Sequence, residues 1–460
     1  MKTKTSRKNF IKTASVAVAG LSFTKSGAFP FIDTRKKILG SNDRVKIGFI
    51  GVGNRGTQLM RAFLKNNDCE VAGLCDVYKP LITRDASQVS ERYLKLHRIP
   101  RMGENFDTGV ARYSDYRKML DDKNIDAVCI ATPDHWHALQ TIDAIKAGKD
   151  VYVEKPLSKT IREGRAMINA AKNSKQIVTV GLNRRAAPLY QKLAEEIPAG
   201  KIGKVSFAQT YHVSNMFPNG IGKMKPEAPP ADFDWNMWLG PRAYRPYQYN
   251  IAPYMFRWWD DYANQLSNNG VHFLDLIRWM LAERAPVAVS AHGGKFVVDD
   301  DRTIPDTMSV TYEFASGKLV TINILEGTSG SFMPYGYIEL RGTKGNIYTH
   351  ENDYKIVPAT AGQFQSYDRP MKEETFTVTD PKLKDSMVNL VRDFLDCVRS
   401  RKQPLANLEE GHLSTVMAHL GTIAMKTGQR LKWDADTERF TNSVEANKHL
   451  SYKYRSPWKL

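Results

Sequence analysis

The first part of the chain alternates short apolar runs with helical patterns of polar and apolar residues. The apolar runs cover Val45–Ile50, Glu70–Cys75, Ile125–Ala131 and Asp150–Val153, and helical patterns separate them. Short apolar runs between helices are typical of strands buried in a parallel sheet. The order therefore predicts a doubly wound α/β domain, in which ligands bind at the carboxyl ends of the strands.

The pattern changes after a predicted helix at Ile161–Ser174 and a strand at Ile177–Val180. From there apolar and polar residues alternate, as in antiparallel strands with one solvated face. The strands predicted in this part are Val205–Val213, Val287–Phe296, Met308–Phe314, Leu319–Leu325 and Tyr337–Leu340. Ala315–Lys318 and Gly342–Gly345 have the composition of hairpin turns. We expect a second, α+β domain with an open, mainly antiparallel sheet.

At 460 residues the chain exceeds what a single hydrophobic core usually holds. The predicted division is a targeting segment and linker at 1–40, a Rossmann domain at 45–165, a substrate and oligomerisation domain at 166–435 and a tail at 436–460. A long insert, Asn215–Tyr262, is crowded with Pro, Trp and Tyr. Loops of this length in a compact domain are usually functional.

The net charge of +17 is unevenly distributed. Residues 1–44 hold ten Lys and Arg against only Asp33 and Asp43. The remainder is mildly basic and has no stripe of Lys and Arg interleaved with aromatic residues, so nucleic acid is not an expected partner. No apolar run reaches the length of a membrane span, and we do not expect an integral membrane protein.

The N-terminus has the order of an export signal. Arg7 and Lys8 precede the apolar stretch Ala14–Phe23, and Ser26–Ala28 supplies small residues for cleavage. The segment is similar to a twin-arginine signal in which Lys8 replaces the second arginine. It predicts a periplasmic or otherwise exported protein, while a Sec signal, a membrane-tethered tail and a disordered N-terminus stay open as alternatives.

The four cysteines form no Cys-x-x-Cys motif and no dense framework. They are Cys69, Cys75, Cys129 and Cys397. Sparse cysteines in or beside apolar elements are predicted to be buried thiols. A bridge between Cys69 and Cys75 stays open for an oxidising compartment.

The strongest motif is the glycine series Gly51, Gly53 and Gly56 between the first strand and the first helix. In the G-x-G-x-x-G pattern the first glycine permits the tight turn, the second lets the backbone approach a pyrophosphate, and the third lets helix and strand pack closely. Asp76 ends the second strand, 20 positions after Gly56. Its carboxylate suits the ribose hydroxyls and repels a 2′-phosphate, which favours NAD over NADP, although Arg55 lies in the loop.

Five ordered motifs together resemble the Gfo/Idh/MocA oxidoreductases. They are the glycine series, Thr132-Pro133 followed by His137, Glu154-Lys155-Pro156, Asn183-Arg184-Arg185, and Gly270-Val271-His272-Phe273-Leu274-Asp275. The resemblance covers roughly residues 45–435. It implies a Rossmann domain, a C-terminal domain whose sheet often forms oligomers, and hydride exchange between NAD(P) and a sugar or polyol carbon.

The resemblance also implies a set of cofactor-binding residues. It places His137 and its neighbours His135 and Trp136 against the nicotinamide half of NAD. The complete predicted set is Gly51, Gly53, Asn54, Arg55, Gly56, Asp76, Thr132, Pro133, His135, Trp136, His137, Glu154, Lys155 and Asn183. The His-x-His spacing of His135 and His137 also suits a metal, but no Cys or acidic cluster offers a third ligand, so no metal is predicted.

Lys155 and His272 are the predicted catalytic pair. A cationic amine at position 155 suits hydrogen bonding to a carbinol oxygen that becomes a carbonyl. An imidazole at position 272 suits the exchange of the hydroxyl proton. Many relatives carry an aspartate four positions before this histidine, where this chain has Asn268. An amide orients a substrate or the histidine without raising the basicity of the imidazole.

The aromatic segment Tyr254–Tyr262 is predicted to bind the substrate. Aromatic faces stack on sugar C–H surfaces, and Arg and Asp side chains bond hydroxyls, although the same aromatic residues suit a core or an interface. The predicted substrate residues are Arg257, Trp258, Tyr262, Asn268 and Tyr211, with His212 a weaker candidate.

The predicted function is therefore NAD-dependent hydride transfer at a ring carbon of a sugar or glycoside, by a homo-oligomer (dimer or tetramer) formed through the C-terminal sheet. A redox-neutral alternative oxidises the ring, eliminates a leaving group, adds water and returns the hydride. Export favours such a cycle, because no free NAD pool is expected outside the cytoplasm. A non-catalytic sugar-binding protein is the second alternative.

Overall fold

The computed structural model describes residues 44–460 apart from 86, 88, 90, 93, 95–108 and 365–370. The chain divides by its contacts into 1–42 and 43–460, and only the second unit is described here. The predicted export signal and most of its linker lie outside the described residues. Among the helices that are described, none combines the length and apolar character needed to cross a membrane.

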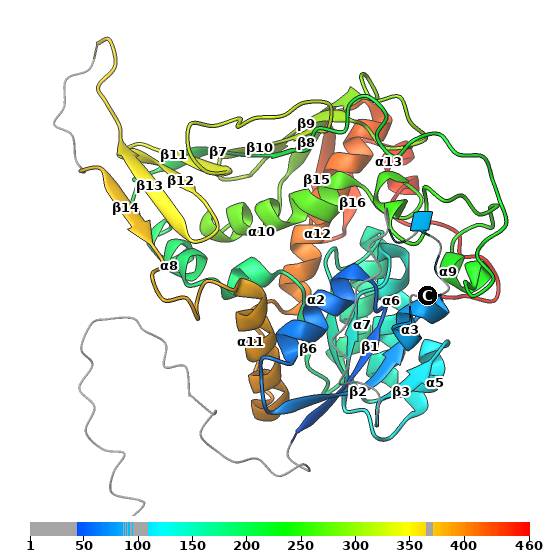
Figure 1. Cartoon of the computed structure of the whole chain (residues 1–460). Helices are drawn as coiled ribbons and strands as arrows, with labels where there is room; N and C mark the ends of the chain where they lie inside the picture. The colour runs from blue at the N-terminus through cyan, green and yellow to red at the C-terminus, as the bar shows by residue number, and fades with distance from the viewer. Residues whose placement is uncertain are drawn as a thin grey trace, which may run out of the picture. The chain divides into compact units, whose positions relative to one another are not determined.

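Residues 45–180 build a six-stranded, fully parallel sheet in the order β3-β2-β1-β4-β5-β6 (Figure 1). Its strands are β1 (Val45–Ile50), β2 (Cys69–Cys75), β3 (Ala111–Tyr113), β4 (Ala127–Ile130), β5 (Asp150–Val153) and β6 (Val178–Val180). The helices of this part are α2 (Asn54–Phe63), α3 (Lys79–Thr83), α5 (Tyr116–Asp121), α6 (Asp134–Lys146) and α7 (Ile161–Lys172). The strand order reverses between β1 and β4, which is where a doubly wound sheet opens a ligand crevice. The Rossmann prediction is confirmed.

The domain boundary predicted at 165 differs from the structure. Residue 165 lies within α7, and β6 pairs with β5 in the parallel sheet. The helix and the strand that follow position 165 therefore belong to the Rossmann domain, because β6 supplies its last strand. The apolar run 177–180 correctly predicted a strand, but the strand was assigned to the second domain instead of the first.

The second domain contains a ten-stranded mixed sheet in the order β14-β13-β12-β11-β7-β10-β9-β8-β15-β16. Its strands are β7 (Val205–Val213), β8 (Ala288–Gly294), β9 (Thr307–Glu313), β10 (Leu319–Leu325), β11 (Ile338–Gly342), β12 (Gly345–Thr349), β13 (Asp353–Pro358), β14 (Glu374–Thr377), β15 (Leu431–Asp434) and β16 (Arg439–Phe440). All neighbours are antiparallel except β7 and β10, which pair in parallel. Both predicted hairpin turns connect antiparallel neighbours and are confirmed.

Helices pack on one face of this large sheet (Figure 1). They are α8 (Pro188–Glu196), α10 (Val271–Met280) and the long α12 (Leu408–Thr427), with α13 (Val444–Lys448) beside α12. Strands β9 and β10 alternate buried and partly exposed residues, with the buried residues in the core shared with these helices. The predicted α+β architecture is confirmed.

Two features join the domains. Helix α11 (Ser386–Ser400) contributes Phe394 to the Rossmann core, edge-on to Phe63 and Tyr152. The insert Asn215–Tyr262, which holds the short helices α9 (Trp235–Leu239) and η4 (Met255–Trp258), also contributes its aromatic residues to that core. The insert therefore packs on the Rossmann domain, although the chain reaches it from the second domain.

All four cysteines are buried free thiols, as predicted, and Cys69 and Cys75 form no disulfide. Burial raises the pKa of the Cys69 thiol to about 12 and that of Cys397 to about 12. These thiols are therefore protonated near neutral pH and have little nucleophilic character.

Candidate active site

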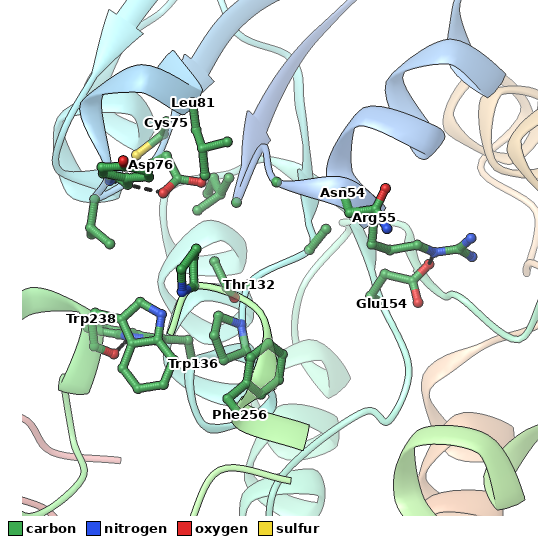
Figure 2. A pocket seen from close by; sticks show the side chains of 18 of the residues that line it. Asn54, Arg55, Cys75, Asp76, Leu81, Thr132, Trp136, Glu154, Trp238 and Phe256 are labelled. Carbon is green, nitrogen blue, oxygen red and sulfur yellow. Dashed lines mark hydrogen bonds and ion pairs between the residues drawn. The ribbon is translucent and has the colours of Figure 1, made fainter. Parts of the chain in front are cut away.

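A cavity of about 310 Å³ lies at the carboxyl ends of the Rossmann strands. The glycine loop and Asp76 line one side, the Glu154-Lys155 turn another, and the insert contributes aromatic side chains (Figure 2). Of the predicted residues, the cavity is lined by Gly51, Gly53, Asn54, Arg55, Asp76, Thr132, Pro133, Trp136, Glu154, Lys155, Arg257 and Asn268. The structure thus brings together residues that are more than 200 positions apart.

The three glycines differ in what a side chain would meet. At Gly51, where φ is +82°, a Cβ would lie 2.7 Å from the carbonyl carbon of Ala131. At Gly56 a Cβ would lie 2.0 Å from the carbonyl oxygen of Gly51, so helix α2 and the loop touch there. At Gly53 the nearest atom is Leu81 Cδ1 at 3.9 Å. Gly51 and Gly56 are required by the fold, whereas Gly53 leaves room above the backbone for a ligand, which fits a dinucleotide pyrophosphate at the start of α2.

Asp76 fixes this loop as well as lining the cavity. Its Oδ2 accepts a hydrogen bond from the backbone N–H of Val52 at 2.9 Å, and its Oδ1 accepts one from Tyr78 at 3.1 Å. Burial raises the pKa of the Asp76 carboxyl, and these backbone donors act in the opposite direction. Each carboxylate oxygen keeps a further lone pair for a ribose hydroxyl.

Arg55 and Glu154 form an ion pair beside the glycine loop, with Arg55 Nε 2.8 Å from Glu154 Oε1 (Figure 2). Glu154 is only 3% exposed, and its Oε2 accepts a hydrogen bond from the backbone N–H of Lys155 at 3.1 Å. The pair holds Arg55 toward Glu154, on the far side of the cavity from Asp76 in Figure 2. Arg55 is thus committed to Glu154 rather than to the ribose end of the cavity.

Lys155 is held by Asn268 across the domain boundary. Its Nζ donates to the backbone oxygen of Asn268 at 2.6 Å and to the side-chain Oδ1 of Asn268 at 3.2 Å. Burial lowers the pKa of Lys155 to about 8, with Glu154 acting against burial and Arg55 with it. An ammonium of this pKa exchanges its proton near neutral pH, as a general acid must.

Asn268 lies in a single π-helical turn, η5 (Leu266–Gly270), directly before α10. Such turns occur frequently at functional sites. The Nδ2 of Asn268 lies 3.4 Å from Gln265 Oε1, and Gln265 Nε2 donates to Glu326 Oε1 at 2.7 Å. Buried Arg302 donates to the other oxygen of Glu326 at 2.8 Å. A buried polar chain therefore supports Asn268 from behind.

His272 occupies the first turn of α10, four residues after Asn268. Burial and the neighbouring cations Lys155 and Arg184 lower the pKa of His272 well below its usual range. The imidazole is therefore neutral at pH 7, and its Nδ1 has no hydrogen-bond partner among the described residues. His272 does not itself line the cavity. A neutral ring with a free nitrogen is the form that a proton acceptor requires.

His135 and His137, predicted to contact the cofactor, lie outside the cavity wall. His135 is fully buried, and its Nε2 donates to the carbonyl oxygen of Trp238 at 2.9 Å. Burial lowers the pKa of His135 to about 3. His137 Nδ1 lies 2.7 Å from the carbonyl oxygen of Pro156, and its Nε2 lies 2.9 Å from that of Thr132. Neither histidine lines the cavity, because both rings are buried and bond through ring nitrogens to backbone carbonyl oxygens.

Trp136, between these histidines, does line the cavity. Its Nε1 donates to the Trp238 carbonyl at 2.9 Å, and its ring packs edge-on against Trp458 from the C-terminal tail, with centroids 4.8 Å apart. Within the described residues no group of three His, Cys, Asp or Glu side chains is placed to hold a metal ion.

The predicted substrate residues occupy different environments. Arg257 lines the cavity, with its guanidinium 4.1 Å from the centroid of the Tyr254 ring. Trp258 turns its Nε1 to Glu326, at 3.0 Å and 3.1 Å from the two carboxylate oxygens. Tyr262 is 1% exposed and packs against the Trp238 and His135 rings, in the core rather than in the cavity.

Two further predicted residues lie outside the cavity wall. Tyr211 is in β7, with its hydroxyl 3.2 Å from the carbonyl oxygen of Gly336, and Asn183 donates to Ser386 Oγ at 2.7 Å. His212, the weaker candidate, also lies outside the cavity wall, and its Nε2 is 3.3 Å from Nδ2 of Asn269, the residue after Asn268.

Sequence reasoning missed most of the aromatic and apolar wall. The insert supplies Phe233, Met237, Trp238, Tyr254 and Phe256 to the cavity. The crowding of aromatic residues in the insert was the available signal, but it does not say which ring faces the cavity. Sequence reasoning also missed the hydrogen-bond network of Gln265, Glu326 and Arg302. Its only local sign in the sequence is that an acid, Glu326, directly follows an apolar strand.

Comparisons with known proteins agree with this geometry. A family model for the NAD-binding Rossmann fold of the GFO/IDH/MocA oxidoreductase family matches residues 45–182, and one for the family's C-terminal alpha/beta domain matches residues 201–460. The myo-inositol 2-dehydrogenase of Thermotoga maritima is 24% identical over 394 residues, which are 84% of this chain and 98% of that protein.

Two other similarities are informative. An alpha-N-acetylgalactosaminidase of Shewanella oneidensis is 28% identical over 181 residues, which are 37% of this chain and 38% of that protein. A levoglucosan dehydrogenase, solved in complex with NADH and levoglucosan, has a similar fold, with a TM-score of 0.62 and 17% identity. That likeness covers 85% of this chain and 99% of the other.

Proposed function

Because this chain belongs to the Gfo/Idh/MocA oxidoreductase family, with its NAD-binding Rossmann domain, we propose that it moves a hydride between NAD and a ring carbon of a sugar or cyclic polyol. The observation that carries the proposal is the position of Lys155. Its ammonium, with a pKa of about 8, lies in the wall of the cavity that the glycine loop opens. The glycine loop for the cofactor and the amine for the reacting hydroxyl thus line the same cavity.

NAD supplies the hydride acceptor in this chemistry. Gly53 leaves room for its pyrophosphate, and Asp76 offers acceptors to its adenosine ribose. The cavity wall formed by Thr132, Pro133 and Trp136 leads from there to Lys155. These residues fit the group, with NAD favoured over NADP by the Asp76 carboxylate.

Lys155 and His272 handle the proton of the reacting hydroxyl. In the oxidation direction the ring carbon loses its hydride and the hydroxyl loses its proton, so the substrate loses two electrons. The Lys155 ammonium donates to the carbinol oxygen and stabilises it as the carbonyl forms. The neutral His272 ring, beside Lys155, accepts the proton. Asn268 holds Lys155 in position through two acceptors.

The substrate class follows from the wall opposite the glycine loop. Arg257 offers a hydrogen-bonding fork, and Trp238, Tyr254 and Phe256 offer apolar faces. This combination suits the hydroxyls and C–H faces of a ring. The myo-inositol and levoglucosan dehydrogenases named above are named for ring polyols and sugars, which supports the same class.

One specific observation favours a second candidate, a redox-neutral glycoside hydrolysis. A relative over 181 residues is named alpha-N-acetylgalactosaminidase, and Asn268 stands where the family resemblance leads us to expect a carboxylate. In that cycle the ring is oxidised, the new ketone acidifies the neighbouring C–H, the aglycone leaves, water adds and the hydride returns. A non-catalytic sugar-binding protein is the third candidate, against which the presence of both Lys155 and His272 counts.

One experiment separates these candidates. The full chain is incubated in D2O with NAD and a panel of cyclic polyols, free sugars and glycosides. We expect NADH to accumulate in proportion to a ketone product without deuterium uptake. Release of aglycone with no NADH, and deuterium beside the oxidised carbon, would instead establish the redox-neutral cycle. Binding without either product would leave only the sugar-binding protein.

We also propose export and self-association. The basic N-terminus with its apolar stretch supports a twin-arginine-like route, which a fusion to a reporter that is active only in the periplasm tests. The face of the large sheet opposite helices α8, α10 and α12 supports a dimer or tetramer. There Phe332 is 48% exposed and packs against Tyr211 of β7, with ring centroids 5.5 Å apart. Light scattering of the purified protein measures the assembly directly.

A further inference from the structure

A second cavity, of about 190 Å³, shares no lining residue with the first. Its wall is unusually cationic: Lys159, Arg242 and Lys426 line it together with His419 and His449. Asp260 is the single carboxylate among the lining residues. The remaining lining residues are neutral: Thr160, Asn264, Thr422, Ile423, Ser451 and Tyr452.

The three cations are only partly neutralised. Lys426 Nζ donates to Asp260 Oδ2 at 2.6 Å, and Arg242 Nη2 pairs with Asp261, which lies outside the cavity wall. No hydrogen bond or ion pair is formed by Lys159 with the described residues. Burial lowers the pKa of Lys159, with Asp260 acting against it and Lys426 with it. The protein thus keeps a desolvated ammonium beside two other cations, which costs stability unless an anion joins them.

Two hydrogen-bond donors of the same cavity also lack acceptors. Asn264 is 5% exposed, and its Nδ2 has no hydrogen-bond partner in the described part of the chain. The Nε of Arg242 is likewise without one, while its guanidinium lies 4.1 Å from the Tyr452 ring centroid. Buried polar groups are normally paired, so two unpaired donors beside an excess of positive charge mark a place for an oxygen-rich anion.

His419 adds an acceptor. Its Nε2 donates to the carbonyl oxygen of Ser158 at 3.0 Å, so the other ring nitrogen is unprotonated when the ring is neutral. Burial lowers the pKa of His419 to about 3, and burial likewise lowers that of His449. A singly protonated phosphate has both acceptor oxygens and one hydroxyl donor, and so matches cations, amide donors and a bare imidazole nitrogen together.

We propose that this cavity, between Lys159, Arg242, Asn264 and Lys426, is an anion site for a phosphate group, free or on a small molecule. Lys159, in its wall, follows Lys155 by four residues in the chain. Asn264 is also one turn before Asn268, whose backbone N–H donates to the Asn264 carbonyl at 2.8 Å. A bound phosphate would therefore contact both segments that meet at Lys155.

The test is thermal unfolding of the full chain in inorganic phosphate and in chloride at equal ionic strength. Saturating NAD is present throughout, so that the glycine loop does not take up the phosphate. We expect phosphate to raise the unfolding midpoint by about 2 °C or more, because it binds the folded state only. Equal midpoints in phosphate and chloride would overturn the proposal.

Two substitutions locate the effect. Lys159→Gln removes the unpaired charge, so the variant should be at least as stable as the parent in chloride and should lose the phosphate response. Lys172→Gln, at the exposed far end of α7, should respond as the parent does. A Lys159→Gln protein that keeps the full response would refute the site. If that variant fails to fold, Lys426→Gln serves, with a response reduced at least several-fold.

Calorimetry separates the two sources of the phosphate group. Inorganic phosphate and glucose 6-phosphate are titrated into the NAD-loaded protein. Tighter binding of glucose 6-phosphate indicates a phosphorylated small molecule, and tighter binding of inorganic phosphate indicates the free ion. Absence of heat with both would contradict the proposal, and none of these measurements depends on the catalytic reaction.

Discussion

The two ends of the first cavity are built in different ways. At the cofactor end the essential features are backbone features: the left-handed Gly51, the open space above Gly53 and the N–H groups that bind Asp76. At the reactive end they are side chains from separate segments, with Lys155 held by Asn268 and Asn268 supported by Gln265 and Glu326. The first end is specified locally by sequence spacing, whereas the second depends on the packing of two domains.

The reactive end should show the largest effect on substitution. Lys155→Met and His272→Ala should each lower kcat by about 10²–10⁴-fold, the usual worth of general acid–base help. NAD affinity, measured by fluorescence titration, should stay near the parental value because the glycine loop is untouched. Lys146→Met, on the exposed end of α6, is the matched control. Parental turnover of His272→Ala would show that the base lies elsewhere, with His212 the next candidate.

The cofactor end is tested by a pair of glycine substitutions. Gly51→Ala forces a Cβ to 2.7 Å from Ala131 at a positive φ, so we expect a loss of about 2–4 kcal/mol in the free energy of unfolding. Gly53→Ala meets nothing closer than 3.9 Å and should leave stability within about 0.5 kcal/mol of the parent. It should nevertheless weaken NAD binding about tenfold or more, since the new methyl group occupies the ligand's space.

Urea unfolding gives the two stabilities, and calorimetry gives the two affinities. The NAD affinity of Gly53→Ala is the most informative of these four values. If Gly53→Ala bound NAD as tightly as the parent, the space above Gly53 would not be where the pyrophosphate lies.

This contrast explains what the sequence could predict. The glycine spacing, Asp76 and the strands 205–213 and 319–325 were readable, because each depends on a local pattern and the observed bounds match. His135 and Tyr262 lie outside the cavity wall for a common reason. Both rings pack around Trp238 of the insert, and no periodicity in their own segments reveals that the insert covers them.

The supporting network was equally hidden. Gln265 and Glu326 are 61 positions apart, and Arg302 lies between them in sequence. Only the folded sheet brings the end of β10 beside the π-helical turn. The sequence shows that Glu326 and Arg302 are charged, but it does not show that they form an ion pair with each other.

Asp76 binds the loop backbone and is also expected to bind the ribose of NAD. Asp76→Asn should therefore have the next largest effect. The amide that replaces Oδ1 or Oδ2 would face a backbone N–H, so one of the two loop bonds is lost together with the charge. We expect NAD affinity to fall about 10- to 100-fold, the range of a charged hydrogen bond. NADP affinity should fall less, and a calorimetric comparison of both cofactors with the parent measures the difference. An unchanged ratio of the two affinities would contradict the ribose role of Asp76.

The supporting chain should matter less than the residues it supports. Gln265→Leu removes the donor to Glu326 and the acceptor near Asn268, so Lys155 loses a fixed partner. We expect kcat to fall about tenfold with little change in NAD affinity, since buried positioning contacts of this kind contribute about 1–2 kcal/mol. Gln265→Glu should not restore the rate, because a second carboxylate would face Glu326. Parental kcat in Gln265→Leu would mean that Asn268 holds Lys155 without help.

The smallest expected effect is that of a substitution at Glu154, which contacts Arg55 at the cofactor end and influences the pKa of Lys155 at the reactive end. Because Lys155 must be protonated to stabilise the oxygen of a ketone during its reduction, the rate of that reduction should show an alkaline limb near pH 8, the pKa of Lys155 being about 8. Glu154 raises this pKa and Arg55 lowers it, so Glu154→Gln removes the favourable charge and leaves Arg55 unpaired. Both changes act in one direction, and the alkaline limb of kcat should move to lower pH. Glu70→Gln, near the opposite end of the parallel sheet, should leave the limb in place. A limb that stays at pH 8 in Glu154→Gln would mean that the limb belongs to a group other than Lys155, and the cofactor and reactive ends would then be electrostatically independent.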